Sequence, residues 1–131
     1  MKVTKEITFD MGHRLSNYSG KCFNLHGHTY KLQVQVEGDI GEDGFVIDFT
    51  ELKEVLKKVT DLFDHKTVLY AVDDVNIKLE QVFPCSIKLI DYEPTAENLA
   101  FYFKKTIQDE LPKYKVSKIR LWETPTSYAE C

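Results

Sequence analysis

The chain has 131 residues, 43% hydrophobic and 29% charged, with a formal net charge of −4 at pH 7. This composition is typical of one globular domain with a substantial core, so we expect a single domain over residues 1–131. The acidic balance and the lack of a basic run argue against nucleic-acid binding. No apolar stretch would span a membrane and residues 1–4 do not resemble a signal peptide. The three cysteines are too widely spaced for a disulfide framework, so these features favour a cytoplasmic location.

The first predicted element is a strand over residues 2–13. Its odd positions carry the apolar residues Val3, Ile7, Phe9 and Met11. Side chains on a strand point alternately to two faces, so this alternation indicates one buried and one exposed face. His13 has the same parity and should end the buried face, before a loop over residues 14–25.

A second strand is predicted to begin at His26. Apolar residues then alternate with polar ones, at Tyr30, Leu32, Val34 and Val36. His26 and His28 have the same parity and therefore lie on the same face. If the two strands form an antiparallel pair, His13 comes beside His26 and His28, with Cys22 on the loop above them.

The first helix is predicted to follow a turn-rich stretch over residues 38–44 and a short strand candidate over residues 45–47. Asp48 is a good N-cap residue, and Glu51 three positions later fits a capping box. The helix is expected to end near Phe63. Its apolar residues at helical spacing are Leu52, Val55, Leu56, Val59 and Leu62.

A second amphipathic helix is predicted from Thr95, a good N-cap residue, with Pro112 limiting its far end. Its apolar face comprises Ala96, Leu99, Ala100, Phe103 and Ile107. Residues 67–85 are hard to interpret, although residues 75–82 are a candidate short helix. Strands are expected over residues 86–92, 116–123 and 128–131.

The order of these elements predicts the fold class. Strands come in pairs around two amphipathic helices, and no repeat, linker or low-complexity tract divides the chain. We therefore expect an α+β fold in which an antiparallel sheet has two helices packed on one face.

Three of the four histidines, His13, His26 and His28, form a candidate metal site. Three neutral imidazoles with one open position are a common catalytic zinc arrangement, although histidine pairs also occur on surfaces by chance. Cys22 leaves two alternatives open. It is either the fourth ligand of a closed structural site, or a free nucleophile or base beside an open one.

Two further segments carry acid–base groups. Asp64 and His65 follow the first helix and form either a polar turn or a proton shuttle, since a carboxylate orients a neighbouring imidazole. Glu123 has the parity of Ile119 and Leu121, so it lies at a solvated strand end or points into a pocket. In a pocket its carboxylate can accept two parallel hydrogen bonds from a guanidine-like pair of N–H groups.

Together these residues resemble the 6-pyruvoyltetrahydropterin synthase family over nearly the whole chain. Five segments occur in the family's order and spacing: Phe9-x-x-x-His13, Cys22-x-x-x-His26-Gly27-His28, Asp64-His65-Lys66, Pro94-Thr95-Ala96-Glu97-Asn98 and Trp122-Glu123-Thr124. The three residues after the cysteine resemble the bacterial 6-carboxy-5,6,7,8-tetrahydropterin synthases of queuosine biosynthesis, because the pyruvoyl-forming branch typically has a longer gap. A third branch has a glutamate in place of the cysteine. The pair Met11-Gly12 departs from the small residues usual before the first histidine.

The resemblance implies three groups of site residues. The ligands of a Zn²⁺ ion would be His13, His26 and His28. The catalytic residues would be Cys22 as base, with Asp64 and His65 completing a proton-transfer triad. The substrate-binding residues would be Glu123, which anchors the pterin ring, and Thr95 and Thr124, which line its pocket.

The resemblance also implies the tunnelling fold, in which subunits join their sheets into a barrel, usually as hexamers with active sites at subunit interfaces. The implied enzyme is a zinc-dependent lyase that converts 7,8-dihydroneopterin triphosphate and water to 6-carboxy-5,6,7,8-tetrahydropterin, releasing acetaldehyde and triphosphate. The redox change is internal to this pterin substrate, so no nicotinamide is needed, and the sequence has no GxGxxG. Alternatives are a pyruvoyl-forming synthase, a sepiapterin side-chain-cleaving relative and, in another class, a non-catalytic zinc-stabilised binding protein.

Overall fold

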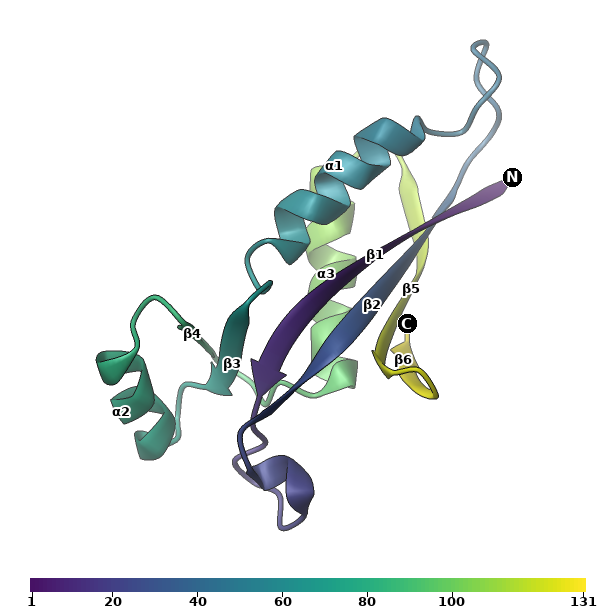
Figure 1. Ribbon diagram of the computed structural model, residues 1–131. Helices are drawn as coiled ribbons and strands as arrows, with labels where there is room; N and C mark the ends of the chain where they lie inside the picture. Colours follow the sequence, from purple (N-terminus) through teal and green to yellow (C-terminus); the bar gives the residue numbers. More distant parts are fainter.

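Six strands form one sheet in the order β4-β3-β1-β2-β5-β6 in the computed structural model, which describes residues 1–131. The elements are β1 (Lys2–His13), a 3₁₀ turn η1 (Lys21–Phe23), β2 (His26–Glu37), α1 (Phe49–Thr60), β3 (Lys66–Tyr70), α2 (Asp74–Val82), β4 (Ile87–Ile90), α3 (Ala96–Glu110), β5 (Lys115–Thr124) and β6 (Ser127–Glu130). Helices α1 and α3 cover one face of the sheet, whereas α2 lies beside β4 at its end (Figure 1). The predicted α+β fold with two helices on one face is confirmed.

The long strands β1 and β2 pair along their whole length. Their antiparallel register places His13 opposite His26 and Met11 opposite His28, as the parity of the sequence predicts. Beyond the histidines, the same face of β2 carries the fully buried side chains of Tyr30, Leu32, Val34 and Val36. A slip of one residue would exchange the two faces, so the apolar alternation fixes where the imidazoles lie.

Helices α1 and α3 supply the other half of the core. Their buried apolar side chains are Leu52, Leu56, Val59, Leu99, Ala100, Phe103 and Ile107. Both predicted N-caps are present. Asp48 Oδ1 accepts the N–H of Thr50 at 2.6 Å, and Thr95 Oγ1 accepts that of Asn98 at 3.3 Å. Each cap satisfies a backbone donor that the first turn of a helix leaves free.

The two ends of α1 differ from the prediction. Glu51 closes no capping box, because its carboxylate accepts the hydroxyl of Tyr114 at 3.3 Å. The helix ends at Thr60, not near Phe63. Because the chain turns there, Phe63 is buried, whereas Leu62, predicted on the apolar face, is 49% exposed.

Strand β3 is the element that the sequence pattern misses. Val68 and Leu69 are both buried, and a strand covered on both faces shows no alternation. It pairs in parallel with β1 and β4, so the sheet is mixed rather than wholly antiparallel. The predicted strand over residues 45–47 is wrong, since that apolar run is irregular backbone whose Val46 and Ile47 pack into the core. Helix α2 confirms the short-helix candidate.

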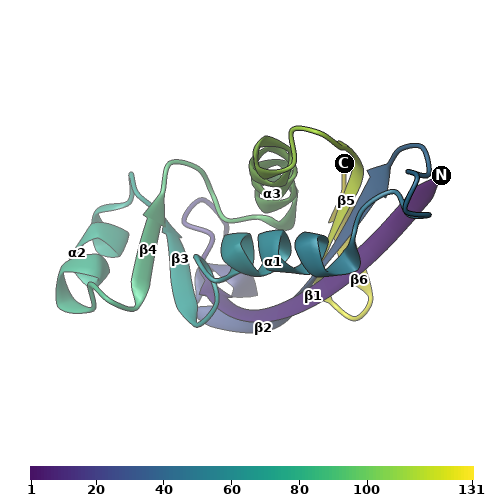
Figure 2. The same ribbon diagram turned by 90° about the horizontal axis from the view of Figure 1, so that it is seen from above.

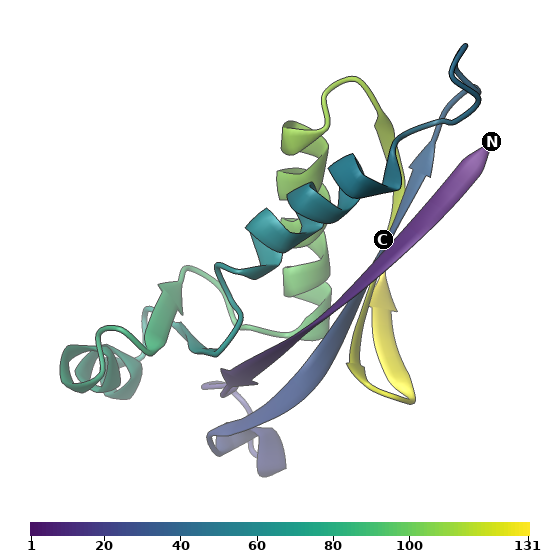
Figure 3. The same cartoon turned by 45° about the horizontal axis from the view of Figure 1, so that its top comes forward.

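The sheet curls into a half-barrel that leaves one face without helices (Figures 2 and 3). Strand β3 pairs with β1 only over Met11–His13, so β1 has an unpaired outer edge over residues 2–9. At the other end of the sheet, β6 is an edge strand of four residues. Unpaired strand edges are surfaces on which a second chain can add strands. No helix of this protein has both the length and the apolar character that a membrane crossing requires.

The centre of the core supplies a test of this packing. Phe103 is fully buried, with its ring centroid 5.7 Å from that of Phe9 and 5.2 Å from that of Phe63. We expect Phe103→Ala to lower the free energy of unfolding by about 3–5 kcal/mol, measured by urea denaturation, because the cavity cannot fully close. Phe101→Ala, at a 64% exposed position of the same helix, should change it by no more than about 0.5 kcal/mol. Equal losses in the two variants would contradict this packing.

Candidate active site

Three imidazoles meet where β1 ends and β2 begins. The register of the two strands puts His13 beside His26, with Nε2 atoms 3.1 Å apart. The ring of His28 lies edge-on to both, with centroids 5.3 Å from that of His13 and 5.0 Å from that of His26. One nitrogen from each of the three rings lies within 4.8 Å of the others, and no cysteine or carboxylate belongs to this group.

Backbone carbonyl groups fix the tautomers of two of these rings. Nδ1 of His13 lies 2.8 Å from the carbonyl oxygen of Pro94, and Nδ1 of His26 lies 2.8 Å from that of Asn24. A carbonyl oxygen can only accept, so both Nδ1 atoms carry the proton and donate it. Both Nε2 atoms are then left with a lone pair, which is the form in which histidine binds a metal.

The remaining nitrogens show that this donor set fits a metal ion. The two Nε2 lone pairs face one another at 3.1 Å, an arrangement that a cation between or beside them would stabilise. Nε2 of His28 is buried and has no hydrogen-bond partner. Burial also lowers the pKa of His13 below its ordinary value, although the hydrogen bond to Pro94 and the charge of Glu123 act in the opposite direction. The buried ring therefore stays neutral and can act as a ligand.

A cavity of about 390 Å³ next to the histidines contains three of the predicted site residues. Cys22 enters it from the 3₁₀ turn, Thr95 from the start of α3 and Glu123 from the end of β5. The apolar side chains of Leu15 and Tyr18 line it as well. This volume lies in the range of small-molecule sites, roughly 300–1,000 Å³. Thr124, at the end of β5, does not line this cavity, and its hydroxyl lies 3.4 Å from that of Thr126.

Glu123 connects the cavity to the histidines, as its strand parity suggests. Its Oε1 lies 3.7 Å from Nε2 of His28. Tyr30, which the sequence indicates only as a core residue, is a further member of the site, with its hydroxyl 3.4 Å from Nδ1 of His13. Burial raises the pKa of Tyr30 far above its ordinary value, and the nearby Glu123 and Cys22 raise it further. The hydroxyl therefore stays protonated and is available as a hydrogen-bond donor.

Asp64 and His65 form the predicted carboxylate–imidazole pair, at the turn between α1 and β3. Asp64 Oδ1 accepts the backbone N–H of Asp10 at 2.9 Å, and Oδ2 lies 3.0 Å from Nδ1 of His65. The Asp10 N–H, and after it His65, lowers the pKa of Asp64, so the carboxylate is ionised at neutral pH. His65 has a left-handed backbone, with φ of 58°, and its side chain is 78% exposed.

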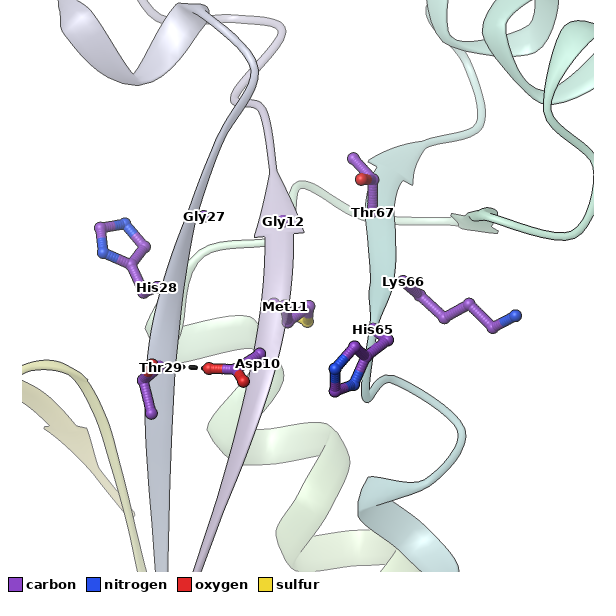
Figure 4. A pocket seen from close by; sticks show the side chains of 9 residues that line it. All are labelled: Asp10, Met11, Gly12, Gly27, His28, Thr29, His65, Lys66 and Thr67. Carbon is purple, nitrogen blue, oxygen red and sulfur yellow. Dashed lines mark hydrogen bonds between the residues drawn. The ribbon is translucent and has the colours of Figure 1, made fainter.

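Within one chain this pair lies apart from Cys22. His65 lines a different cavity of about 410 Å³, together with Asp10 and Thr29 from the helix-free side of β1 and β2, and with His28 at its edge. Figure 4 shows the ring of His65 on one side of the two strands and that of His28 on the other. One copy of the chain therefore brings Cys22, Thr95 and Glu123 into one cavity, and places His65 in another, away from Cys22.

Several supporting groups could not be found from the sequence. The carbonyl groups of Asn24 and Pro94 orient the imidazoles, and backbone groups leave no signal in a pattern of side chains. The carboxylate of Glu93 accepts the N–H groups of Ser16 and Asn17, at 3.0 and 3.1 Å, and so holds the loop that leads to Cys22. A glutamate next to a proline suggests only a turn when read from the sequence.

The chain resembles known proteins in both sequence and structure. The profile of the family described as 6-pyruvoyl tetrahydropterin synthase matches residues 2–131. The chain is 43% identical to the 6-carboxy-5,6,7,8-tetrahydropterin synthase of Haemophilus influenzae, covering 98% of this chain and 96% of that protein. It is 35% identical to the enzyme of the same name from Rickettsia bellii, covering 99% of each. The solved 6-pyruvoyl tetrahydropterin synthase of Plasmodium falciparum superposes with a TM-score of 0.79 at 26% identity, covering 100% of this chain and 96% of that one.

The lowered pKa of His13 predicts how the metal-free protein responds to pH. The unfolded chain takes up a proton on this ring near pH 6.5, whereas the folded protein does so only at lower pH. The unfolded state thus binds more protons between these two values, so stability should fall as the pH drops below about 6.5 and level off below the folded-state pKa. Urea titrations with a chelator present, at pH values from about 7.5 to 5, measure this slope.

His13→Gln provides the control, because its side chain cannot titrate. The difference in free energy of unfolding between wild type and His13→Gln should shift against the wild type as the pH falls through this window. A difference that does not vary with pH would contradict the assignment of a neutral, buried His13.

Proposed function

Because the chain belongs to the 6-pyruvoyl tetrahydropterin synthase family and is one of its enzymes, we propose that it is a lyase acting on 7,8-dihydroneopterin triphosphate. With one water consumed, the products would be 6-carboxy-5,6,7,8-tetrahydropterin, acetaldehyde and triphosphate, within queuosine (7-deazaguanine) biosynthesis. The observation that carries the proposal is the sequence similarity, 35–43% identity over nearly the whole chain, to proteins named for this product. The thiol of Cys22, in the cavity that Glu123 joins to the three histidines, supports it.

We further propose that the metal is zinc, held by His13, His26 and His28. The Nε2 atoms of His13 and His26 are 3.1 Å apart, close to the roughly 3.3 Å expected for two nitrogens on one tetrahedral zinc ion. When bound, zinc would act as a Lewis acid that stabilises negative charge on the side-chain oxygens of the substrate. The main-chain acceptors Pro94 and Asn24 would hold two ligand rings in place throughout turnover.

The pterin ring would bind in the 390 Å³ cavity that Glu123 and Thr95 line. An ionised carboxylate accepts two parallel hydrogen bonds, which suits the 2-amino group and the adjacent ring N–H of a pterin. Tyr18 and Tyr128, at the wall of the same cavity, offer aromatic surface for the flat ring. The substrate side chain would then extend from Glu123 toward the three histidines.

Cys22 would be the base that takes a proton from the substrate side chain, in its thiolate form. His65 would return or relay a proton through Nε2, since Asp64 Oδ2 lies 3.0 Å from Nδ1 and its negative charge favours a proton there. Thr124, whose hydroxyl lies 3.4 Å from that of Thr126, would lie at the edge of the pocket.

The separation of His65 from Cys22 within one chain supports an oligomer with shared sites. The cavity that contains His65 opens on the helix-free side of the sheet, where the unpaired edges of β1 and β6 are also available. Joining these edges between copies would close the half-barrel, and the Asp64–His65 pair of one copy would meet Cys22 of the next. We propose that the enzyme is a homo-oligomer, a hexamer by family resemblance.

The alternatives in the same family differ in product. The three residues between Cys22 and His26, and the names of the relatives, favour the carboxy-forming reaction over pyruvoyl formation or sepiapterin cleavage. The rival binding protein would need Cys22 as the fourth metal ligand. Its sulfur does not belong to the group of metal-binding atoms formed by the three histidines, which argues against a closed structural site.

The proposed role of Cys22 predicts the effect of its removal. Cys22→Ala should keep about one zinc per chain but lower kcat at least about 100-fold, because the base is lost and the ligands are not. Zinc content is measured by atomic absorption, and the product formed from 7,8-dihydroneopterin triphosphate is identified by mass spectrometry. His28→Ala is the matched control, which should lose both zinc and activity. Full turnover in Cys22→Ala would refute its role as base.

Sharing of sites between copies can be tested by mixing two inactive variants. Cys22→Ala and His65→Ala should each be inactive alone, because each removes one proton-transfer group from every site. After joint denaturation and refolding in equal amounts, about a quarter of the sites should be whole, and a corresponding fraction of wild-type activity should return. The control is Cys22→Ala refolded together with the variant that carries both Cys22→Ala and His65→Ala. A mixture that stays inactive would contradict sharing of the site.

A further inference from the structure

The 3₁₀ turn that carries Cys22 has little to hold it in place by itself. It spans three residues, Lys21–Phe23, none of which is buried, and Gly20 before it provides no side-chain cap. Such short turns have poor hydrogen-bond geometry and depend on their surroundings. The position of the thiol relative to the histidines must therefore be set by groups outside the turn.

The buried side chain of Arg14 contacts this turn through its guanidinium group. Arg14 is only 7% exposed, and its Nε donates to the carbonyl oxygen of Phe23 at 3.0 Å. The guanidinium group also stacks on the ring of Phe23, 4.4 Å from its centroid. The planar group thus contacts both the backbone and the side chain of the residue next to Cys22.

The start of α2 holds this guanidinium group from its other side. Nη1 of Arg14 donates to Asp73 Oδ2 at 3.0 Å and to Asn76 Oδ1 at 2.7 Å. Asn76 is completely buried, and its Nδ2 donates to Ser16 Oγ and to the carbonyl oxygen of Tyr70. Buried polar groups are stable only when their partners are present, so these hydrogen bonds restrain the guanidinium group of Arg14.

We propose that Arg14 is a positioning residue for Cys22, and that Asp73 and Asn76 are its support. The chain of contacts runs from α2 through the guanidinium group to Phe23 and so to the turn that presents the thiol. This gives a function to the start of α2, in the part of the chain where the sequence pattern is hardest to interpret. The inference rests on the proposed role of Cys22 as base.

Three variants separate this role from general stability. Asn76→Ala removes one support and leaves every proposed catalytic residue intact, Arg14→Met removes the charge and the hydrogen bonds, and Arg14→Lys keeps the charge but not the planar fork. Gln108→Ala is the matched control. Its amide also makes three hydrogen bonds, to Leu111, Tyr114 and Val116, but it lies about 18 Å along α3 from the cavity.

Steady-state kinetics with 7,8-dihydroneopterin triphosphate should show a split between kcat and KM. We expect kcat to fall about 10-fold in Asn76→Ala and about 100-fold in Arg14→Met, with Arg14→Lys between wild type and Arg14→Met, because a displacement near 1 Å is enough for such losses. KM should change less than about twofold and zinc content should not change, since Glu123 and the histidines are untouched. Gln108→Ala should lower the Tm but not kcat.

A second readout does not depend on the substrate. Alkylation of Cys22 by iodoacetamide, relative to the exposed Cys85 of the same chain, is followed by peptide mass spectrometry. A released turn opens the thiol to solvent, so this ratio should rise at least about threefold in Asn76→Ala and Arg14→Met, and not in Gln108→Ala.

The outcomes distinguish the two proposals. If Asn76→Ala and Arg14→Met keep both kcat and the alkylation ratio, or lose zinc together with activity, Arg14 does not position Cys22. If losses follow the Tm in all variants, including Gln108→Ala, the role is only structural and the inference is overturned. If the wild type forms no product, the proposed function fails, and the alkylation ratio still decides whether Arg14 controls the turn.

Discussion

Two hydrogen bonds from imidazole rings to backbone carbonyl groups determine which ring nitrogens of His13 and His26 are free to bind a metal. The carbonyl groups of Pro94 and Asn24 take the Nδ1 protons of His13 and His26, which forces both Nε2 lone pairs toward the same point. The carbonyl of Pro94 lies just before α3, 81 residues from His13, whereas that of Asn24 lies between the 3₁₀ turn and β2, two residues before His26. The metal-binding form of the imidazoles therefore exists only when the helix, the loop and the sheet have assembled, which couples the donor set to the complete fold.

The elements nearest this site are also the most predictable. Alternation in β1 and β2 predicts their pairing, their buried face and the meeting of His13 with His26, because one periodicity governs all three. Strand β3 could not be found in the same way, since both its faces are covered and its Val68 and Leu69 are adjacent. Helical spacing has a similar limit. Leu62 continues the apolar spacing of α1, but the helix ends at Thr60 and Leu62 is exposed.

The site shows a similar division between what a sequence contains and what only the fold provides. Side chains with evident chemistry, such as Cys22 and Glu123, can be recognised, and the fold brings both to one cavity. Arg14 and Asn76 are ordinary polar residues in the sequence, and only their burial and mutual contacts reveal them. The separation of His65 from Cys22 could not be predicted either, because spacing along the chain does not say which face of the sheet a turn approaches.

The left-handed backbone at His65 has a consequence for the evolution of this enzyme. Residues with a side chain adopt φ near 58° at a cost of about 1–3 kcal/mol in strained sites, whereas glycine does so freely. With 78% of the side chain in solvent, the isolated chain recovers little of that cost through packing. A laboratory selection for thermal stability alone would therefore replace this histidine with glycine early. The selected proteins would be more stable but would lack the imidazole at position 65.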